Sequence, residues 1–146
     1  MVYSLQHLTI ETKLKVKYMQ TKTLEMLLEE ANKQIKRLSY EESLSIINEP
    51  NTIIIDVREE SEVINSGIIK KAIHIPRGLL EFTLIPNSPN NPVKIDDNTN
   101  ILVYCAGGYR SALGAKTLKD LGFKNVYNLG GYTEWLDNGG DIQAHT

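Results

Sequence analysis

Short apolar runs alternate along the chain with segments in which apolar residues recur every three or four positions. The runs at 53–56, 73–75, 101–104 and 126–128 predict buried strands. The segments between them carry helical patterns, and strands that alternate with helices favour a parallel sheet covered on both faces. The sequence therefore predicts an α/β fold built on an open parallel sheet.

An amphipathic helix is predicted ahead of the first strand, over residues 21–36. Its apolar residues recur at helical spacing and form one face, and they are Leu24, Leu27, Leu28, Ala31 and Ile35. This helix covers an edge of the chain's own sheet or offers a contact to a partner or a second copy. The pattern leaves both open.

Local signals mark further boundaries. Ser39 is typical of a helix N-cap, and the stretch 86–100, rich in Asn and Pro, predicts a surface loop. Gly139 and Gly140 are expected to end the last helix.

The candidate chemistry lies where the third strand gives way to a helix predicted over 111–118. Cys105, the only cysteine, follows the strand directly. Backbone N–H groups and the positive end of the helix dipole converge at such a turn and favour the nucleophilic thiolate. The glycines that follow allow several amides to turn inward as an anion nest. The expected nest comprises Ala106, Gly107, Gly108, Tyr109, Arg110 and Ser111.

The size of this loop separates two chemistries. Four residues stand between Cys105 and Arg110, one fewer than in the signature of cysteine phosphatases. A tighter loop suits a single sulfur atom carried on the cysteine better than a tetrahedral phosphate. An inert, buried cysteine at the end of a core strand is the plain structural alternative.

The loop resembles the active-site loop of the rhodanese family, the single-domain sulfurtransferases. Three other segments resemble the family's pattern in the right order: the strand ending in Asp-x-Arg at 53–58, the Ile-Pro segment at 72–78, and the Gly-Gly turn with its Trp-bearing helix at 128–135. The resemblance covers about residues 37–142. It implies a rhodanese-like domain over 37–146, preceded by an N-terminal extension over 1–36 that carries the amphipathic helix.

The resemblance also implies supporting residues. Asp56 and Arg58, at the carboxyl end of a strand, are expected to form an ion pair that holds loops near the cysteine. Arg77 is expected either at the rim of the pocket, in contact with an anionic donor, or simply facing solvent. Neither a metal nor a cofactor is expected.

Composition restricts the partners and the compartment. A formal net charge of −2 gives no indication of nucleic acid as a partner, and no apolar stretch approaches the length of a membrane span. The first residues lack the order of a signal peptide. With a single cysteine no internal disulfide can form, so a reducing cytoplasm is the expected compartment.

The function that the resemblance implies is sulfur transfer through a persulfide on Cys105. The expected donor is a small anion such as thiosulfate, and the acceptor is cyanide in an assay or a thiol or sulfur-carrier protein in a cell. Two alternatives remain open: a rhodanese-like module that binds a partner or senses oxidants without catalysis, and a phosphatase or arsenate reductase of related fold. A homodimer is compatible with the sequence.

Overall fold

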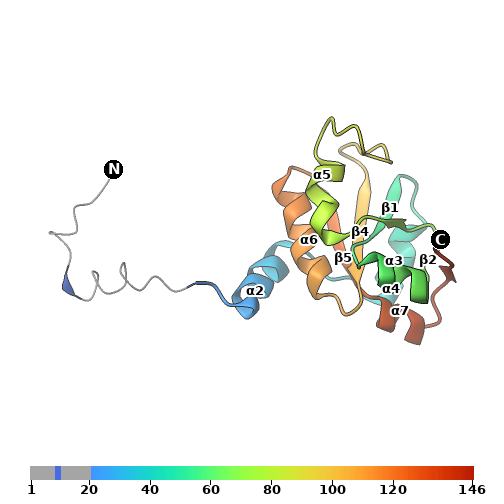
Figure 1. Ribbon diagram of the computed structural model, residues 1–146, viewed down its shortest axis with the longest axis horizontal. Coiled ribbons are helices and arrows are strands. Elements are labelled where there is room, and N and C mark those ends of the chain that lie inside the picture. The colour runs from blue at the N-terminus through green and yellow to red at the C-terminus, as the bar shows by residue number, and fades with distance from the viewer. Residues whose placement is uncertain (1–8, 11–20) are drawn as a thin grey trace.

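Four parallel strands form the central sheet of the computed structural model, which describes residues 9–10 and 21–146. The order across the sheet is β3-β1-β4-β5, and Figure 1 labels β1, β4 and β5 of this sheet. The strands are β1 (Thr52–Asp56), β3 (Ile73–His74), β4 (Asn100–Cys105) and β5 (Asn125–Gly131). The predicted α/β fold with an open parallel sheet is confirmed.

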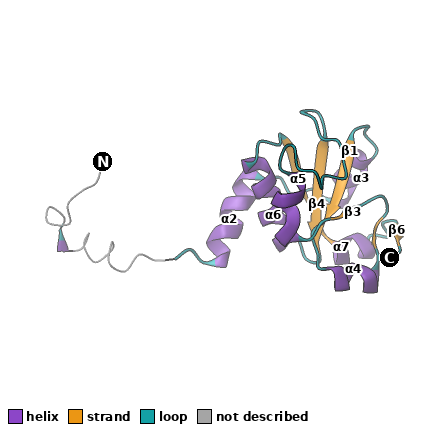
Figure 2. Cartoon of the chain, turned by 45° about the horizontal axis from the view of Figure 1, so that its top comes forward, coloured by secondary structure: helices purple, strands orange, loops and turns teal. Residues whose placement is uncertain are grey.

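Helices cover both faces of this sheet, as Figure 2 shows. Side chains of successive strand residues point to opposite faces, so Val103 belongs to one apolar core and Leu102 to the other. The first core lies beneath α5 (Leu80–Leu84) and α6 (Tyr109–Asp120), and the second beneath α3 (Tyr40–Ile47), α4 (Glu60–Ser66) and α7 (Tyr132–Asp137). The site therefore rests on a sheet buried on both sides.

The predicted amphipathic helix is α2 (Leu24–Gln34), which packs against α6. Ala31 is fully buried and Ile35, just after the helix, is 3% exposed, whereas Leu24 is 63% exposed. Beyond the helix, the backbone around Arg37 pairs in parallel with Asn128 of β5. The segment that follows α2 thus continues the sheet past its last strand.

Several short elements had no counterpart among the predictions. They are α4, α5, a 3-10 turn η2 (Arg77–Leu79) and a small antiparallel sheet of β2 (Ile68–Ile69) with β6 (Ile142–Gln143). The predicted N-cap of α3 is confirmed, because the Ser39 hydroxyl accepts a hydrogen bond from the Glu42 N–H. Among the described residues, no helix combines the length and apolar character needed to span a bilayer.

A register shift distorts the sheet next to the cysteine. Val103 pairs with Asn128, but the next residue, Tyr104, pairs with Gly130, so Leu129 is an extra residue in β5. Bulges of this kind bend a strand and redirect its side chains, and they are frequent beside active sites. Here the bulge brings Gly131 opposite Cys105.

Candidate active site

Cys105 ends β4, and its side chain is 1% exposed. Three residues separate it from α6, which begins at Tyr109, two residues earlier than the sequence predicted. The helix begins early because Gly108, at its N-cap, has a φ of +96°, which turns the chain sharply into the first helical turn. The cysteine therefore lies directly beneath the N-terminus of α6.

Polar groups from this helix start surround the sulfur. The N–H groups of Gly108 and Ser111 donate to Cys105 Sγ at 3.0 and 3.4 Å, and the Ser111 hydroxyl lies 3.4 Å from the same atom. Burial raises the pKa of the Cys105 thiol, but these hydrogen bonds lower it by more, so the pKa lies below its ordinary value. The site favours thiolate, as an anion nest should.

The Arg110 guanidinium lies near the sulfur, but its hydrogen bonds go to the carboxylate of Glu62 in α4, with which it forms a bidentate ion pair. The two N···O distances are 2.8 and 2.9 Å. The pair lowers the pKa of Glu62 to about 2 and raises the pKa of Arg110, to which the nearby Cys105 also contributes. The loop of residues 106–111 around the sulfur is called the cradle below. Arg110 is a fixed cation beside it, held in place by a helix on the opposite face of the sheet.

The other loop residues form the outer wall. Tyr109 is 65% exposed at the tip of the loop, while the Ala106 carbonyl faces the backbone of β5. A Cβ on Gly131 would lie 2.6 Å from the Ala106 oxygen and 3.0 Å from the Gly107 Cα. The loop thus lies so close to β5 that only glycine fits opposite it.

The structure brings Asp56 and Arg58 together as a buried ion pair, 2.7 Å between Arg58 Nη2 and Asp56 Oδ2. Arg58 also donates to Ser66 Oγ and to the Gly67 carbonyl, at the end of α4. Its guanidinium lies 4.1 Å from the ring centre of Tyr132. This pair fixes the end of α4, the helix that carries Glu62, on the face of the sheet opposite to the cysteine.

Arg77 lies against α6, away from the loop's hydrogen bonds. Its guanidinium donates to Glu81 at 2.9 Å and to the Thr117 hydroxyl at 3.0 Å. The expected contact between Arg77 and an anionic donor stays a prediction, because in the structure this side chain is held by α5 and α6.

Sequence reasoning missed three residues around the cradle. Glu62 holds Arg110, Asn128 bonds to the Ser111 hydroxyl and the Gly108 carbonyl, and Arg37 lies over Gly108 and Gly130 while paired with Glu134. Each comes from a segment distant in sequence from Cys105. Only the Asp-x-Arg and Gly-Gly segments next to Glu62 and Asn128 could have directed attention to them.

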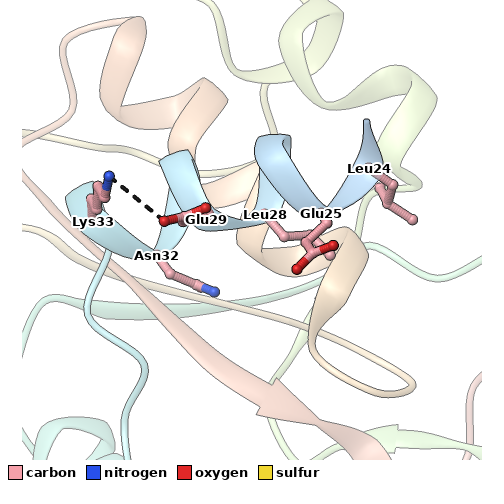
Figure 3. A pocket seen from close by; sticks show the side chains of 6 residues that line it. All are labelled: Leu24, Glu25, Leu28, Glu29, Asn32 and Lys33. Carbon is pink, nitrogen blue, oxygen red and sulfur yellow. Dashed lines mark ion pairs between the residues drawn. The ribbon is translucent and has the colours of Figure 1, made fainter. Parts of the chain in front are cut away.

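A shallow hollow of about 590 Å³ lies along α2 (Figure 3), and it is not a candidate for this chemistry. Figure 3 shows its side chains along a single helix, with Lys33 paired to Glu29 at 3.8 Å. The described residues that line it include no thiol or hydroxyl side chain. They are Leu24, Glu25, Leu28, Glu29, Asn32 and Lys33.

A curated relative is similar to part of this sequence. A tRNA uridine(34) hydroxylase from Prochlorococcus marinus (strain MIT 9215) is 35% identical over 95 residues. The match covers 63% of this chain and 30% of the hydroxylase. The chain thus spans less than a third of that relative's length.

Two solved structures match most of the chain. A protein from Rhodopseudomonas palustris, described as a possible tyrosine phosphatase, is 35% identical, with a TM-score of 0.76 over 85% of this chain and 96% of its own. The polysulfide-sulfur transferase homodimer from Wolinella succinogenes is 27% identical, with a TM-score of 0.65 over 93% of this chain and 90% of its own. The profile of the rhodanese-like domain matches residues 39–138, and the chain belongs to the rhodanese-like family.

Proposed function

We propose that the protein is a sulfurtransferase that carries a sulfane sulfur on Cys105 as a persulfide. The observation that carries this proposal is the pair of backbone N–H groups, from Gly108 and Ser111, that donate to the buried sulfur. The same groups suit a terminal persulfide sulfur, which is also an anion. A relative of nearly equal length, the Wolinella protein, is a polysulfide-sulfur transferase.

In the first step the Cys105 thiolate attacks the outer sulfur of a donor such as thiosulfate. A sulfur–sulfur bond forms to Cys105 as the sulfur–sulfur bond of thiosulfate breaks. Sulfite leaves with the electron pair of the broken bond, and Cys105 becomes a persulfide anion. Arg110, fixed by Glu62 at the mouth of the loop, provides the positive charge that favours approach of the anion.

In the second step an external nucleophile attacks the terminal sulfur, and the Cys105 thiolate is the leaving group. Cyanide would give thiocyanate, and a thiol or a sulfur-carrier protein would give a new persulfide. Cys105 is the only cysteine in the chain, so within one chain no second thiol can resolve the persulfide. The exchange is therefore of the ping-pong type, and a reducing cytoplasm is the compartment we propose for it.

Intact-mass measurement tests this function directly. The purified protein is weighed before and after thiosulfate or polysulfide treatment, with Cys105→Ser as the control. We expect a gain of one sulfur on the wild type alone, released by cyanide as thiocyanate. If neither donor adds sulfur, the proposal fails, and the alternative of a binding or redox-sensing module gains support.

The phosphatase alternative is weaker for a geometric reason. The sulfur takes its two amide hydrogen bonds from residues three and six positions after Cys105, within a loop one residue shorter than the phosphatase signature. Because the Rhodopseudomonas relative is described as a possible tyrosine phosphatase, hydrolysis of p-nitrophenyl phosphate is the matching assay. Turnover that is lost in Cys105→Ser would favour the phosphatase.

A second candidate follows from the Prochlorococcus relative, a tRNA uridine(34) hydroxylase. The chain could supply the rhodanese-like part of such an activity. Hydroxylation is a two-electron oxidation, so mass analysis of tRNA nucleosides after incubation with the protein and O2 as the oxidant tests this candidate. New hydroxylated uridine that depends on Cys105 would support it over sulfur transfer to a small acceptor.

A further inference from the structure

Asn128 is a buried polar residue to which the sulfur-transfer reaction assigns no role. It lies in β5 immediately before the bulge at Leu129, and it is 1% exposed. Its backbone is tied to the segment after α2, because its N–H donates to the Lys36 carbonyl and its carbonyl accepts from Leu38. The backbone position of Asn128 is therefore fixed on both sides.

The side-chain amide of Asn128 makes three hydrogen bonds, two of them to the loop around Cys105 and one to its own strand. Its Oδ1 accepts from the Ser111 hydroxyl at 2.8 Å and from the Gly130 N–H at 2.9 Å, and its Nδ2 donates to the Gly108 carbonyl at 3.0 Å. Two of these partners, Ser111 and Gly108, are the residues that donate to Cys105 Sγ. One amide thus bonds to both residues that contact the sulfur.

The bond to Ser111 determines which way its hydroxyl proton points. The hydroxyl has one proton and three nearby acceptors, Asn128 Oδ1 at 2.8 Å and, more distant, Cys105 Sγ and the Gly130 carbonyl, both at 3.4 Å. While the sulfur is a thiol, the proton goes to Asn128 and the hydroxyl can accept from S–H. When the sulfur is an anion, the hydroxyl can turn its proton to Sγ, and the Gly130 N–H still satisfies Oδ1.

The hydrogen bond from Asn128 to the Gly108 carbonyl acts on the Gly108 N–H, which donates to the sulfur. The Gly108 N–H points at the sulfur only while this residue keeps its left-handed conformation, with φ at +96°. Asn128 Nδ2 holds the carbonyl of the same residue. Since glycine is the residue least restrained by its own side chain, this hydrogen bond adds to the restraint from the Ala112 N–H, which donates to the same carbonyl at 3.3 Å.

We propose that Asn128 is a positioning residue, which holds in place the two residues, Gly108 and Ser111, whose N–H groups donate to the sulfur of Cys105. The proposal rests on the proposed function only in that the same donors would hold the persulfide. The side-chain hydrogen bonds of Asn128 go to Ser111, Gly108 and Gly130, so it acts on the sulfur through these residues.

Other charged groups near the cradle stay unchanged when Asn128 is replaced. Arg110 of α6 lies beside the sulfur and is paired with Glu62 of α4. Arg37 lies over Gly108 and is paired with Glu134 of α7. The pair of Asp56, the last residue of β1, and Arg58, two residues later, lies on the opposite face, where Arg58 lies against Tyr104 and Tyr132.

The test is the pH dependence of iodoacetamide alkylation of Cys105 in Asn128→Asp and Asn128→Ala. Both variants lose the donor to the Gly108 carbonyl, and Asp adds a negative charge. We expect the thiol pKa to rise by about one pH unit, the effect of weakening one hydrogen bond to a charged group. Asn125→Asp is the matched control, because Asn125 lies in the same strand and bonds to the distant Asp97 carbonyl.

A double variant separates the two routes. If Asn128 acts partly through the Ser111 hydroxyl, the pKa change of the double variant differs from the sum of the changes of Asn128→Ala and Ser111→Ala. A folded Asn128 variant with reduced melting temperature and unchanged thiol pKa would overturn the proposal, since the amide would then only stabilise the fold.

A measurement on the wild type covers the case in which the variants do not fold. The side-chain amide NMR signals of Asn128 are expected to shift with the titration midpoint of Cys105, while those of Asn125 stay constant. No shift at Asn128 would count against the proposal. Alkylation and NMR need no sulfur donor, so these results stand apart from the outcome of the sulfur-transfer assay.

Discussion

A thiol that is 1% exposed would ordinarily resist ionisation, because burial disfavours the charged form. At Cys105 the amides of Gly108 and Ser111 outweigh that penalty, and the thiol pKa lies below its ordinary value. The same burial that opposes ionisation strengthens each hydrogen bond to the resulting anion, since little water competes. The reactivity of Cys105 therefore depends on hydrogen-bond donors held in a fixed orientation, and not on exposure of the sulfur to solvent.

Replacement of the sulfur itself tests that view. Cys105→Ser is expected to abolish sulfur transfer, because a serine hydroxyl cannot carry a sulfane sulfur at neutral pH. The fold should survive, since a hydroxyl can accept the same hydrogen bonds from Gly108 and Ser111. Thiocyanate formation and thermal unfolding are the two measurements. Substantial residual transfer in a clean Cys105→Ser preparation would contradict the persulfide mechanism.

Removal of the neighbouring charge is expected to act in one direction. Arg110→Ala should raise the pKa of Cys105 by up to about one unit and weaken donor binding, because a cation beside the thiolate favours its charged form. The pH profile of alkylation reports the first effect, and the KM for thiosulfate the second. Lys116→Ala is the control, since this cation lies in the same helix and its ammonium pairs with Asp120 at 2.9 Å. Equal effects of the two substitutions would argue against a specific role for Arg110.

Residues contiguous with the cysteine could be predicted, and those that complete the site could not. Cys105, Arg110 and Ser111 lie within one turn of chain, so local geometry sufficed. Glu62 lies 48 positions before Arg110, and no periodicity or spacing relates the two. From the sequence, Asn128 is only the first residue of the Gly-Gly segment. Its role depends on the bulge in β5, which no pattern in the sequence predicts.

At the scale of elements, the length of a segment decided whether its pattern could be interpreted. The strands β1 and β4 follow continuous apolar runs, and α2 and α3 carry either a clear period or a capping residue. The unpredicted α5 has five residues and β2 has two. Elements this short contain too few positions to show a period, and tertiary packing determines them instead.

The helix α2 gives a prediction at this scale. Ile35→Ala is expected to lower the free energy of unfolding by about 2–4 kcal/mol, because Ile35 lies in the core beneath α6 and its loss leaves a cavity. Leu24→Ala, on the exposed side of α2, should change it by less than about 0.5 kcal/mol. Urea unfolding measures both. Two equally small effects would mean that α2 and the turn after it add little to the stability of the domain.

Across the whole molecule, the site draws its parts from both faces of the sheet. The cysteine and α6 belong to one face, whereas Glu62 belongs to α4 on the other. Their ion pair meets at the carboxyl edge, where parallel strands end and α/β proteins place their sites. The buried Asp56–Arg58 pair anchors α4 from within, since Arg58 bonds to Ser66 and Gly67. The position of Arg110 therefore depends on packing on both sides of the sheet.

The ion pair between Arg110 and Glu62 should make the stability of the protein depend on pH. The pKa of Glu62 falls from 4.5 to about 2 in the folded protein, so its contribution is fully present above about pH 4.5 and is lost as the pH falls towards 2. The pair is a third exposed, so solvent limits that contribution to about 1 kcal/mol. Glu62→Gln should lower the melting temperature at pH 7 by a few degrees, and the difference from wild type should shrink by pH 2.5. The exposed Glu60→Gln, in the same helix, is the control. A difference that stays constant with pH would mean that Glu62 stabilises the fold through packing, and that its charge does not hold Arg110 over the cradle.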